Sequence, residues 1–426
     1  MTPLDTYYTR TRADAPLRPA FSGTQTADVA IIGGGLAGLN TALGLAERGV
    51  KNIAVLEAQT LGWGASGRNG GFVDNGFSRD LISVAHAVGT PRAQTMAKHA
   101  GNAVELIRHR ITTHAILCDK TDGILYADWF DDEKGLREKI DTLNDTFNLG
   151  YQFMPRNHLR DLYRTTRYYD GVFKPTGFHM HALNYALGLA RVAEGLGVRL
   201  HETSPVTDLR PTSDGYQLTT PDGQLRAGKV VVCCSGHIGG LFTPLSRATL
   251  PVETYVMLTE PLGDRLASAI RAPYAVSDTR FAPDYYRPLP DGRLLWGGRI
   301  ATLPIPEHRL ADTMRGDMLK VYPQLADVKV ELAWRGIMGY ATHMMPQIGE
   351  LQPGLWYNMG HGGHGLGTTT MAGELVAAGI AHGDTSYAVF APFGLAWAWG
   401  PAGQVGVQLM YWWYQALDDI RERLKN

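Results

Sequence analysis

Three glycines near the start of the chain have the spacing that a dinucleotide-binding turn requires. Gly33, Gly35 and Gly38 form the pattern Gly-x-Gly-x-x-Gly. The first glycine permits a tight turn, the second lets a pyrophosphate approach the backbone, and the third allows a helix to pack closely on a strand. The N-terminus of that helix offers unpaired N–H groups and a positive dipole to phosphate oxygens. This pattern alone is weak evidence for dinucleotide binding, so the interpretation depends on the strands and the helix around it.

These glycines lie inside a strand–helix–strand unit of the usual length, about 30 residues. Residues 29–32 are apolar and rich in β-branched side chains, which predicts a buried strand, and residues 39–48 carry apolar side chains at helical spacing. A second strand is expected at 53–56, and it ends at Glu57. A carboxylate at that place binds ribose hydroxyls and disfavours a 2′-phosphate. The unit therefore predicts an adenine dinucleotide other than NADP.

A second glycine-rich run follows this acid. Residues 62–71 hold one Arg, one Asn and one Ser among five glycines. That mixture suits a backbone that lies against a pyrophosphate or a flat ring with a few donors aimed at it. We therefore expect this loop to contact the cofactor rather than to be a plain linker.

Composition excludes several classes of protein. The 426 residues include 40 Lys and Arg against 41 Asp and Glu, a net charge of −1, so the basic excess that nucleic-acid binding needs is absent. Three cysteines are too few for a disulfide scaffold or a four-Cys zinc site, and no apolar targeting segment stands at residues 1–21. A cytoplasmic location is expected. Cys233 and Cys234 follow an expected strand at 229–232 and should be small buried side chains.

Further motifs give the chain a specific family resemblance. With the opening unit, segment 65–71 (ASGRNGG) resembles the D-amino-acid-oxidase-type FAD-dependent oxidoreductase superfamily. The resemblance is closest to the branch that holds γ-glutamylputrescine oxidase and the bacterial L-pipecolate oxidases. It covers about residues 20–385, and the other segments that carry it are 179–184, 284–287 with 293–298, 322–325, 345–349 and 360–367.

The resemblance implies a fold and a division of the chain. The implied fold is an α/β FAD-binding domain, Rossmann-like and of the glutathione-reductase type, interleaved with an α+β substrate domain on a mostly antiparallel sheet. The expected division is an N-terminal arm at 1–26, an FAD-binding domain at 27–85, 150–248 and 335–385, a substrate domain at 86–149 and 249–334, and a Trp-rich C-terminal extension at 386–426.

The resemblance also implies cofactor and chemistry: FAD accepts a hydride from the carbon next to an amine nitrogen, which gives an imine that water hydrolyses. In this role the glycine bend 360–367 would approach the ring edge, and a helix expected from Thr368 would aim its positive end at the developing negative charge. The residues expected to hold the cofactor are Gly33, Gly34, Gly35, Leu36, Ala37, Gly38, Glu57, Ala58, Gly64, Ala65, Ser66, Gly67, Arg68, Asn69, Gly70, Gly71, Val206, Ser235, Gly236, Gly363, His364, Gly365, Leu366, Gly367 and Thr368.

Tyr286, Arg335 and His364 are the catalytic candidates. Arg335 would either anchor a substrate carboxylate or be a surface residue; relatives often carry a small residue at its place between Trp and Gly. His361 and His364 lack a Cys or carboxylate partner in sequence, so no metal site is expected. Other candidates for the substrate pocket are Tyr285, Arg287, Trp334, Tyr340 and His343.

Covalent attachment of the flavin is not expected, since members of the superfamily that tether it use a Cys near 337–340 or a His after the Trp at position 63, and this chain has neither. No Lys stands at 252–259, where sarcosine-oxidase-like members place an oxygen-activating lysine. The electron acceptor, O₂ or another, therefore stays open.

The C-terminal stretch is unusual because residues 387–417 carry no charged side chain and include four tryptophans. Its length would allow a membrane span, but its prolines and glycines argue against one. Three interpretations stay open: packing across the folded body, a subunit interface that would make a homodimer, or a peripheral membrane contact.

Three functions follow as hypotheses. The first is an FAD-dependent oxidase of a small amine, most of all a γ-glutamylated polyamine, with reoxidation by O₂ to H₂O₂; an imino-acid or N-methyl amino acid oxidase, or a dehydrogenase that reduces a quinone, is the alternative. The second is an NAD-linked dehydrogenase. The third is a non-catalytic flavin-binding or membrane-attached interaction protein.

Overall fold

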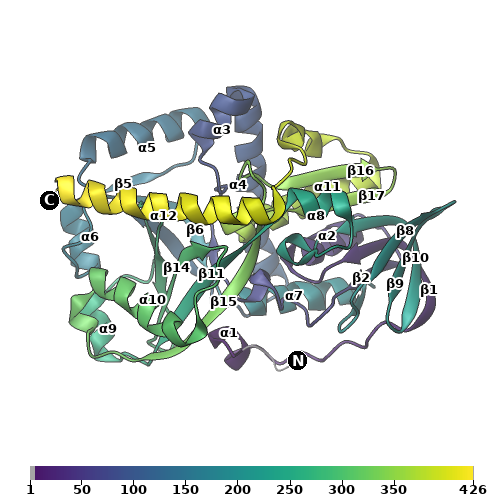
Figure 1. Cartoon of the computed structure of the whole chain (residues 1–426), viewed down its shortest axis with the longest axis horizontal. Helices are drawn as coiled ribbons and strands as arrows, with labels where there is room; N and C mark the ends of the chain where they lie inside the picture. Colours follow the sequence, from purple (N-terminus) through teal and green to yellow (C-terminus); the bar gives the residue numbers. More distant parts are fainter. Residues whose placement is uncertain (1–4, 426) are drawn as a thin grey trace.

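The computed structural model describes residues 5–425 and contains two β-sheets that lie side by side (Figure 1). A short helix, α1 (Tyr7–Arg10), precedes the first strand. The first sheet lies on the right of Figure 1 and the second on the left, with helices stacked against both.

The first sheet has a parallel centre, in which β1 pairs with β2 and β10, β2 with β7, and β10 with β17. An antiparallel β16 closes one edge, and the hairpin of β8 and β9 pairs with the first half of β10. The bounds are β1 (Gly23–Ile32), β2 (Ile53–Leu56), β7 (Arg199–His201), β8 (Asp208–Thr212), β9 (Gly215–Thr220), β10 (Gly223–Val232), β16 (Gln347–Gln352) and β17 (Leu355–Met359).

Both faces of this sheet are buried, as the uninterrupted apolar run in β1 predicts. Val29 and Ile31 belong to the core formed with the helices, whereas Ala30 and Ile32 belong to a separate core on the opposite face. The helices of the first core include α2 (Leu36–Glu47), α4 (Thr90–Thr113), α7 (Ala182–Gly195) and α11 (Gly365–His382). Helix α11 packs against α2 and α4.

The second sheet is mostly antiparallel, with one parallel pair between β12 and β4. Its strands are β3 (Phe72–Val73), β4 (Thr121–Ala127), β5 (Gln152–Met154), β6 (Gly171–His179), β11 (Leu250–Thr259), β12 (Ala275–Asp278), β13 (Tyr285–Pro288), β14 (Leu294–Ala301) and β15 (Val330–Tyr340). The two sheets confirm the expected fold class.

The division of the chain differs from the expected one between residues 150 and 181. The sequence assigned this segment to the FAD-binding domain, but β5 and β6 are strands of the second sheet. Strand β6 pairs antiparallel with β3, β4 and β5, so its hydrogen bonds bind it to the second sheet along its whole length. Strand β15 likewise lies in the second sheet through Tyr340, beyond the expected boundary at 335.

The remaining helices are distributed over both sheets. They are α3 (Leu81–Val88), α5 (Glu133–Phe147), α6 (Arg156–Leu162), α8 (Thr243–Ala248), α9 (Asp264–Ala269), α10 (Glu307–Val321) and α12 (Gly400–Lys425). Single-turn segments are η1 (Ala65–Gly67), η2 (Ser235–His237), η3 (Pro323–Leu325) and η4 (Gly362–His364), and η5 (Ser386–Phe393) is slightly longer. Helix α12, yellow in Figure 1, runs across the front of the molecule and contacts β11 and β14.

Candidate active site

The glycine turn after β1 leaves a helix N-terminus open. Gly33 has φ +108°, a conformation that side chains disfavour, and a Cβ on Gly38 would lie 1.9 Å from the Gly33 carbonyl oxygen. Helix α2 begins at Leu36, three residues earlier than expected, with Gly35 at its N-cap and no side chain bonded to that cap. Apart from the N–H of Leu36, which donates to Ser66, the first turn of α2 therefore offers its N–H groups and positive dipole to an anion.

Glu57, the acid at the end of β2, is held by the same turn. Its carboxylate accepts hydrogen bonds from the backbone N–H of Gly34 at 2.7 Å and of Gln59 at 2.8 Å. Burial raises the pKa of Glu57, and these two bonds act in the opposite direction. Two further lone-pair positions on the carboxylate remain for hydroxyl donors such as those of a ribose.

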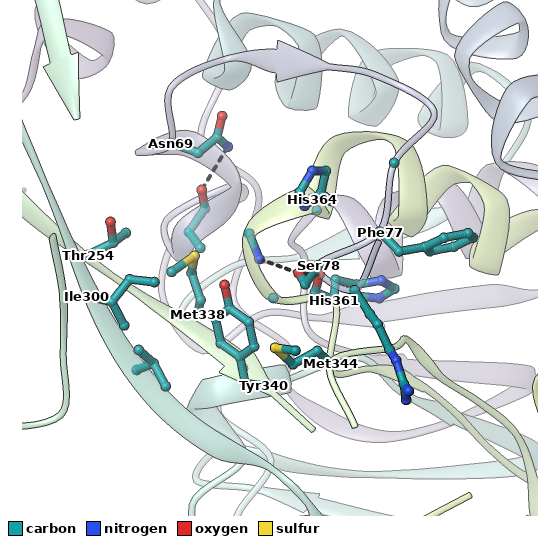
Figure 2. Close-up of a pocket in the computed structure, with 18 of the residues that line it drawn as sticks. Asn69, Phe77, Ser78, Thr254, Ile300, Met338, Tyr340, Met344, His361 and His364 are labelled. Carbon is teal, nitrogen blue, oxygen red and sulfur yellow. Dashed lines mark hydrogen bonds between the residues drawn. The ribbon is translucent and has the colours of Figure 1, made fainter. Parts of the chain in front are cut away.

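The loop 62–71 folds onto this turn as the single-turn segment η1. The Ser66 hydroxyl accepts from the backbone N–H of Leu36 at 2.9 Å, and the Asn69 amide donates to the carbonyl oxygens of Ala65 and Ser66 at 2.9 and 3.0 Å. Figure 2 shows Asn69 at the upper edge of the cavity. The Arg68 guanidinium lies over the Trp63 ring, and its Nη2 is buried with no hydrogen-bond partner within residues 5–425.

The glycine bend 360–367 lies on the opposite side of the same cavity. The Ser78 hydroxyl accepts from the backbone N–H of Gly363 at 3.0 Å, as the dashed line in Figure 2 marks. Helix α11 begins at Gly365, so the expected start at Thr368 was wrong. Gly367 allows this earlier start, because a Cβ there would lie 2.6 Å from the Asp74 carbonyl oxygen.

The two histidines of the bend have different surroundings. His361 is buried and bonded on both ring nitrogens, by Nε2 to Asn358 at 2.9 Å and by Nδ1 to Thr368 at 3.1 Å. Burial lowers its pKa to about 3, so His361 is a neutral side chain that holds the bend. His364 reaches the cavity wall with its Nε2 3.9 Å from an oxygen of Asp74, while its Nδ1 is buried and unpaired among the described residues.

Asp74 is the centre of a buried polar cluster that the sequence did not reveal. Its Oδ2 accepts from the Lys174 ammonium at 2.9 Å and from the Tyr126 hydroxyl at 3.0 Å, and its Oδ1 accepts from the backbone N–H of Gly76 at 3.2 Å. Burial alone would raise the pKa of Asp74, but the positive charge of Lys174 and the nearness of His364 hold it well below its usual range.

Aromatic rings enclose the cation of this cluster. The Lys174 ammonium lies 4.0 Å from the Tyr126 ring centroid and 4.9 Å from that of Tyr151. Its pKa is raised well above the usual value because the attraction of Asp74 outweighs the cost of burial. Lys174 is thus a charged but internally neutralised group. We call Asp74, Lys174, Tyr126 and His364 the Asp74 cluster.

All of these groups line one continuous cavity of about 1920 Å³. It runs from the α2 turn and Glu57 to the Asp74 cluster, and reaches α3, α5 and α12. The expected cofactor residues on its wall are Gly33, Gly35, Leu36, Ala37, Glu57, Ala58, Gly64, Ala65, Ser66, Arg68, Asn69, Gly70, Val206, Ser235, Gly236, Gly363, His364, Gly365 and Leu366. Those that lie behind the wall are Gly34, Gly38, Gly67, Gly71, Gly367 and Thr368.

Two of the three catalytic candidates lie away from this cavity. Tyr286 is buried in the core of the second sheet, stacked on Trp296 and bonded through its hydroxyl to that of Tyr322 at 2.8 Å. Its neighbour Tyr285 lines the cavity instead. Arg335 is largely exposed and pairs with Glu253 at 3.3 Å, which agrees with the surface alternative. His364 alone of the three reaches the wall.

The matches to known proteins fit this arrangement. Residues 28–378 match the model of the family described as DAO, FAD dependent oxidoreductase. The chain belongs to this family of FAD-dependent oxidoreductases, which confirms the resemblance seen in the sequence. It is 34% identical to the gamma-glutamylputrescine oxidoreductase of Escherichia coli over 83% of each chain, and 32% identical to the probable oxidoreductase OrdL of Haemophilus influenzae over 97% of each.

Solved structures share the fold at low sequence identity. The L-proline dehydrogenase of P. horikoshii has a TM-score of 0.74 at 17% identity, with 87% of this chain and 98% of that one covered. The glycine oxidase of Bacillus cereus has a TM-score of 0.70 at 22% identity, with coverage of 85% and 97%. Within residues 5–425, no helix is both long and apolar enough to cross a bilayer.

The residues present fit FAD on three counts. First, the turn before α2 has no room for a side chain at position 38, and its free N–H groups can bind a phosphate. Second, the Glu57 carboxylate lies beside this turn and can accept further hydrogen bonds. Arg68 Nη2 and His364 Nδ1 are buried polar atoms with no partner in the described part of the chain. Such atoms are costly unless a bound group satisfies them. Arg68 is in loop 62–71 and His364 in the glycine bend 360–367, and both residues line the cavity.

Proposed function

We propose that the protein oxidises the terminal amine of a γ-glutamylated polyamine, or of a similar small aliphatic amine. Bound FAD supplies a two-electron acceptor for the hydride on the carbon next to the amine nitrogen. The substrate loses that hydride and a proton from nitrogen to become an imine, and water converts the imine to an aldehyde and ammonia. O₂ is the proposed final acceptor, and it is reduced to H₂O₂.

The observation that carries this proposal is the continuity of the cavity between the two sheets. A single volume of about 1920 Å³ joins the α2 turn, where the dinucleotide phosphates bind, to the strands of the second sheet. This volume exceeds the roughly 300–1,000 Å³ of ordinary ligand pockets. It therefore has room for both FAD and a long substrate side by side, which would orient the reacting carbon towards the flavin.

Charge at the inner end of the cavity supports an amine that lacks an α-carboxylate. The buried cation there, Lys174, already pairs with Asp74 at 2.9 Å, and Arg335 lies outside the cavity. A substrate carboxylate at this end would have to displace an internal ion pair. The neutral form of an amine is the form that releases hydride. It can lie beside the Asp74 cluster without breaking the Asp74–Lys174 ion pair.

The wall formed by α3 and α5 offers separate charges of both signs. Arg79 and Lys139 line it together with Asp80, Asp128 and Asp132. Asp128 is buried, which raises its pKa to about 6. The ionised form of a buried carboxylate is unfavourable, and an ammonium group bound next to it stabilises that form. This wall suits the amino and carboxylate groups at the γ-glutamyl end of a substrate whose other end carries the reacting amine.

Anaerobic flavin bleaching tests the proposal. The purified holoprotein should lose its absorbance near 450 nm on mixing with γ-glutamylputrescine, more slowly with putrescine, and not with pipecolate, proline or sarcosine. Bleaching by the imino acids alone would move the function to the imino-acid alternative. A flavin that no amine reduces would leave a non-catalytic protein. Admission of O₂ then distinguishes an oxidase, which forms H₂O₂, from a dehydrogenase that needs a quinone or dye.

We further propose that the FAD is not covalently bound. Of the cysteines of the cavity wall, Cys233 is buried and Cys234 is partly buried, and desolvation raises the pKa of Cys234 to about 12, so it is not a ready thiolate. Acid precipitation should release all of the yellow colour into the supernatant. Colour that stays with the precipitated protein would contradict this.

A further inference from the structure

Helix α12 is attached to the molecule by its polar side. The Gln408 amide oxygen accepts from the backbone N–H of Thr302 at 3.0 Å and of Leu303 at 3.1 Å. Two turns before the C-terminal end, the Asp418 carboxylate accepts from the backbone N–H of Phe281 and of Ala282 at 3.3 and 3.2 Å. Near the same end Glu422 binds Trp129 and Arg167. These bonds use the polar side chains of α12 on the protein itself.

The opposite side of α12 presents apolar side chains to solvent. Around and along the helix, eight large apolar side chains are between 45% and 59% exposed: Trp397, Trp399, Val405, Leu409, Met410, Trp412, Trp413 and Ile420. Residues 385–417 contain no charged residue. A surface helix normally buries its apolar stripe and exposes its polar one. Here the arrangement is reversed, which points to a further apolar contact.

The exposed stripe has the spacing of a helix–helix seam. Ala402, Gly406, Leu409, Trp413, Ala416 and Ile420 follow one another at intervals of four, three, four, three and four, and every one of them is exposed. We call these six residues the α12 seam. Apolar positions at alternating steps of three and four form the contact of paired helices.

We propose that the α12 seam is the interface of a homodimer, in which α12 packs antiparallel against α12 of a second copy. A two-fold axis level with Tyr411 places every seam residue opposite another. Leu409 then faces Trp413, Gly406 faces Ala416, and Ala402 faces Ile420. Such an interface is isologous and closes on itself. The small pair Gly406 and Ala416 lets the two backbones approach on either side of the central Leu and Trp layers.

The exposed area agrees with a stable dimer. Eight large side chains, each about half exposed, offer roughly 800 Å² per copy if each contributes about 100 Å². A standard interface buries about 800 Å² on each partner. An apolar patch of this size also lies above the roughly 300–600 Å² that monomers usually expose.

A second copy suits this face better than a lipid surface does. Helices that lie in a bilayer interface carry Lys and Arg on the polar side that faces the headgroups. The polar side of α12 is bonded to the protein, and the basic residues of the helix are confined to 421–425, beyond the seam. Gly406 and Met410 also line the cavity, so a second copy would cover its rim. Nothing in this proposal depends on the substrate.

Sedimentation equilibrium of the holoprotein tests the dimer. The wild type should show twice the 46.6 kDa of one chain. Leu409→Lys should give a monomer, with at least a 100-fold weaker dimerisation constant, because two ammonium groups would enter the centre of the seam. Leu117→Lys is the matched control, since Leu117 is 81% exposed but lies before β4, and it should stay dimeric. Unchanged thermal midpoint and flavin content would show that Leu409→Lys is folded.

Engineered cysteines test the register. Chains carrying Ala402→Cys, mixed with chains carrying Ile420→Cys, should oxidise to a covalent dimer, because these positions face each other. Either variant alone should not, since 18 residues separate its two thiols by about 27 Å along the helix axis. A monomeric wild type, a dimer that Leu409→Lys leaves intact, or a monomer that binds phosphatidylcholine vesicles through Leu409 would each overturn the proposal.

Discussion

The Lys174 ammonium lies 2.9 Å from the Asp74 carboxylate in the wall of the cavity, on a strand and a loop that are 100 residues apart in the chain. Both side chains are almost fully buried. Each therefore depends on the other, because a buried charge without a partner is strongly unfavourable. The pair connects β6 of the second sheet to the loop that follows β3.

Removal of one member of this pair should destabilise the protein. Lys174→Met leaves the Asp74 carboxylate buried without its cation, and we expect a loss of about 3–5 kcal/mol in the free energy of unfolding. Asp74→Asn should cost a similar amount, and the double variant much less than the sum. Urea denaturation of the four proteins measures this. Additive single effects below about 1 kcal/mol would mean that the two groups do not act as a pair.

The same pair predicts the response to acid. The pKa of Asp74 is lower in the folded protein than in the unfolded chain, so its stabilisation is complete above about pH 4 and declines as pH falls further. In Lys174→Met, burial without the cation raises that pKa, so protonation of Asp74 should relieve the strain. The wild type should therefore lose stability between pH 5 and pH 3 more steeply than Lys174→Met does. Identical slopes would contradict this assignment.

Asp128 has the opposite pH dependence. Burial raises its pKa to about 6, so the folded state favours the protonated form. Its favourable contribution is complete below about pH 4 and disappears as pH rises through 6, an effect of up to about 3 kcal/mol. Asp128→Asn should thus be more stable than the wild type at pH 7.5, with little difference at pH 4. Urea denaturation at pH 7.5 and at pH 4 measures this difference. Asp132→Asn, at an exposed position, is the control.

The dinucleotide turn could be predicted because its signals are local. The glycine spacing, the two short strands and Glu57 lie within one stretch of sequence, and hydrogen bonding keeps them together. The Asp74 cluster gave no such signal, since Asp74, Tyr126, Lys174 and His364 come from four separate segments. Only the pairing of β4 with β6 and the docking of α11 bring them together. Nothing in the sequence around Lys174 indicates that this side chain is buried, so only the three-dimensional structure reveals it.

The error at Tyr286 has a different cause. Successive side chains of a strand point to opposite faces, so a motif can identify a pair of aromatic residues without indicating which one meets the cavity. In β13 it is Tyr285 that lines the cavity, and Tyr286 enters the core. Arg335 in β15 is exposed between two buried neighbours, Trp334 and Gly336, by the same alternation. A shift of one residue thus separates a site residue from a surface one.

Gly38 should be essential for FAD binding. In Gly38→Ala the new methyl group would lie 1.9 Å from the Gly33 carbonyl oxygen, so the turn must open. We expect at least a 100-fold weaker affinity for FAD and a protein that purifies largely colourless. Flavin fluorescence titration of the apoprotein measures it. Gly101→Ala in α4 is the control, because its Cβ would meet nothing within 4 Å and should leave FAD binding unchanged.

Tyr285 and Tyr286 should separate catalysis from stability. Tyr286→Phe removes the partner of the Tyr322 hydroxyl in the core, so we expect a loss of about 1–3 kcal/mol in unfolding free energy with kcat and KM unchanged. Tyr285 lines the cavity beside Gly70, and a Cβ on Gly70 would lie 2.5 Å from its ring. Tyr285→Leu leaves a gap there and should raise the KM for the amine about tenfold, or about 1.4 kcal/mol. Urea denaturation and steady-state kinetics on both variants provide the comparison. If Tyr286→Phe instead lost turnover while its stability stayed intact, the catalytic role would belong to Tyr286 after all, and the cavity wall at β13 would need a different register.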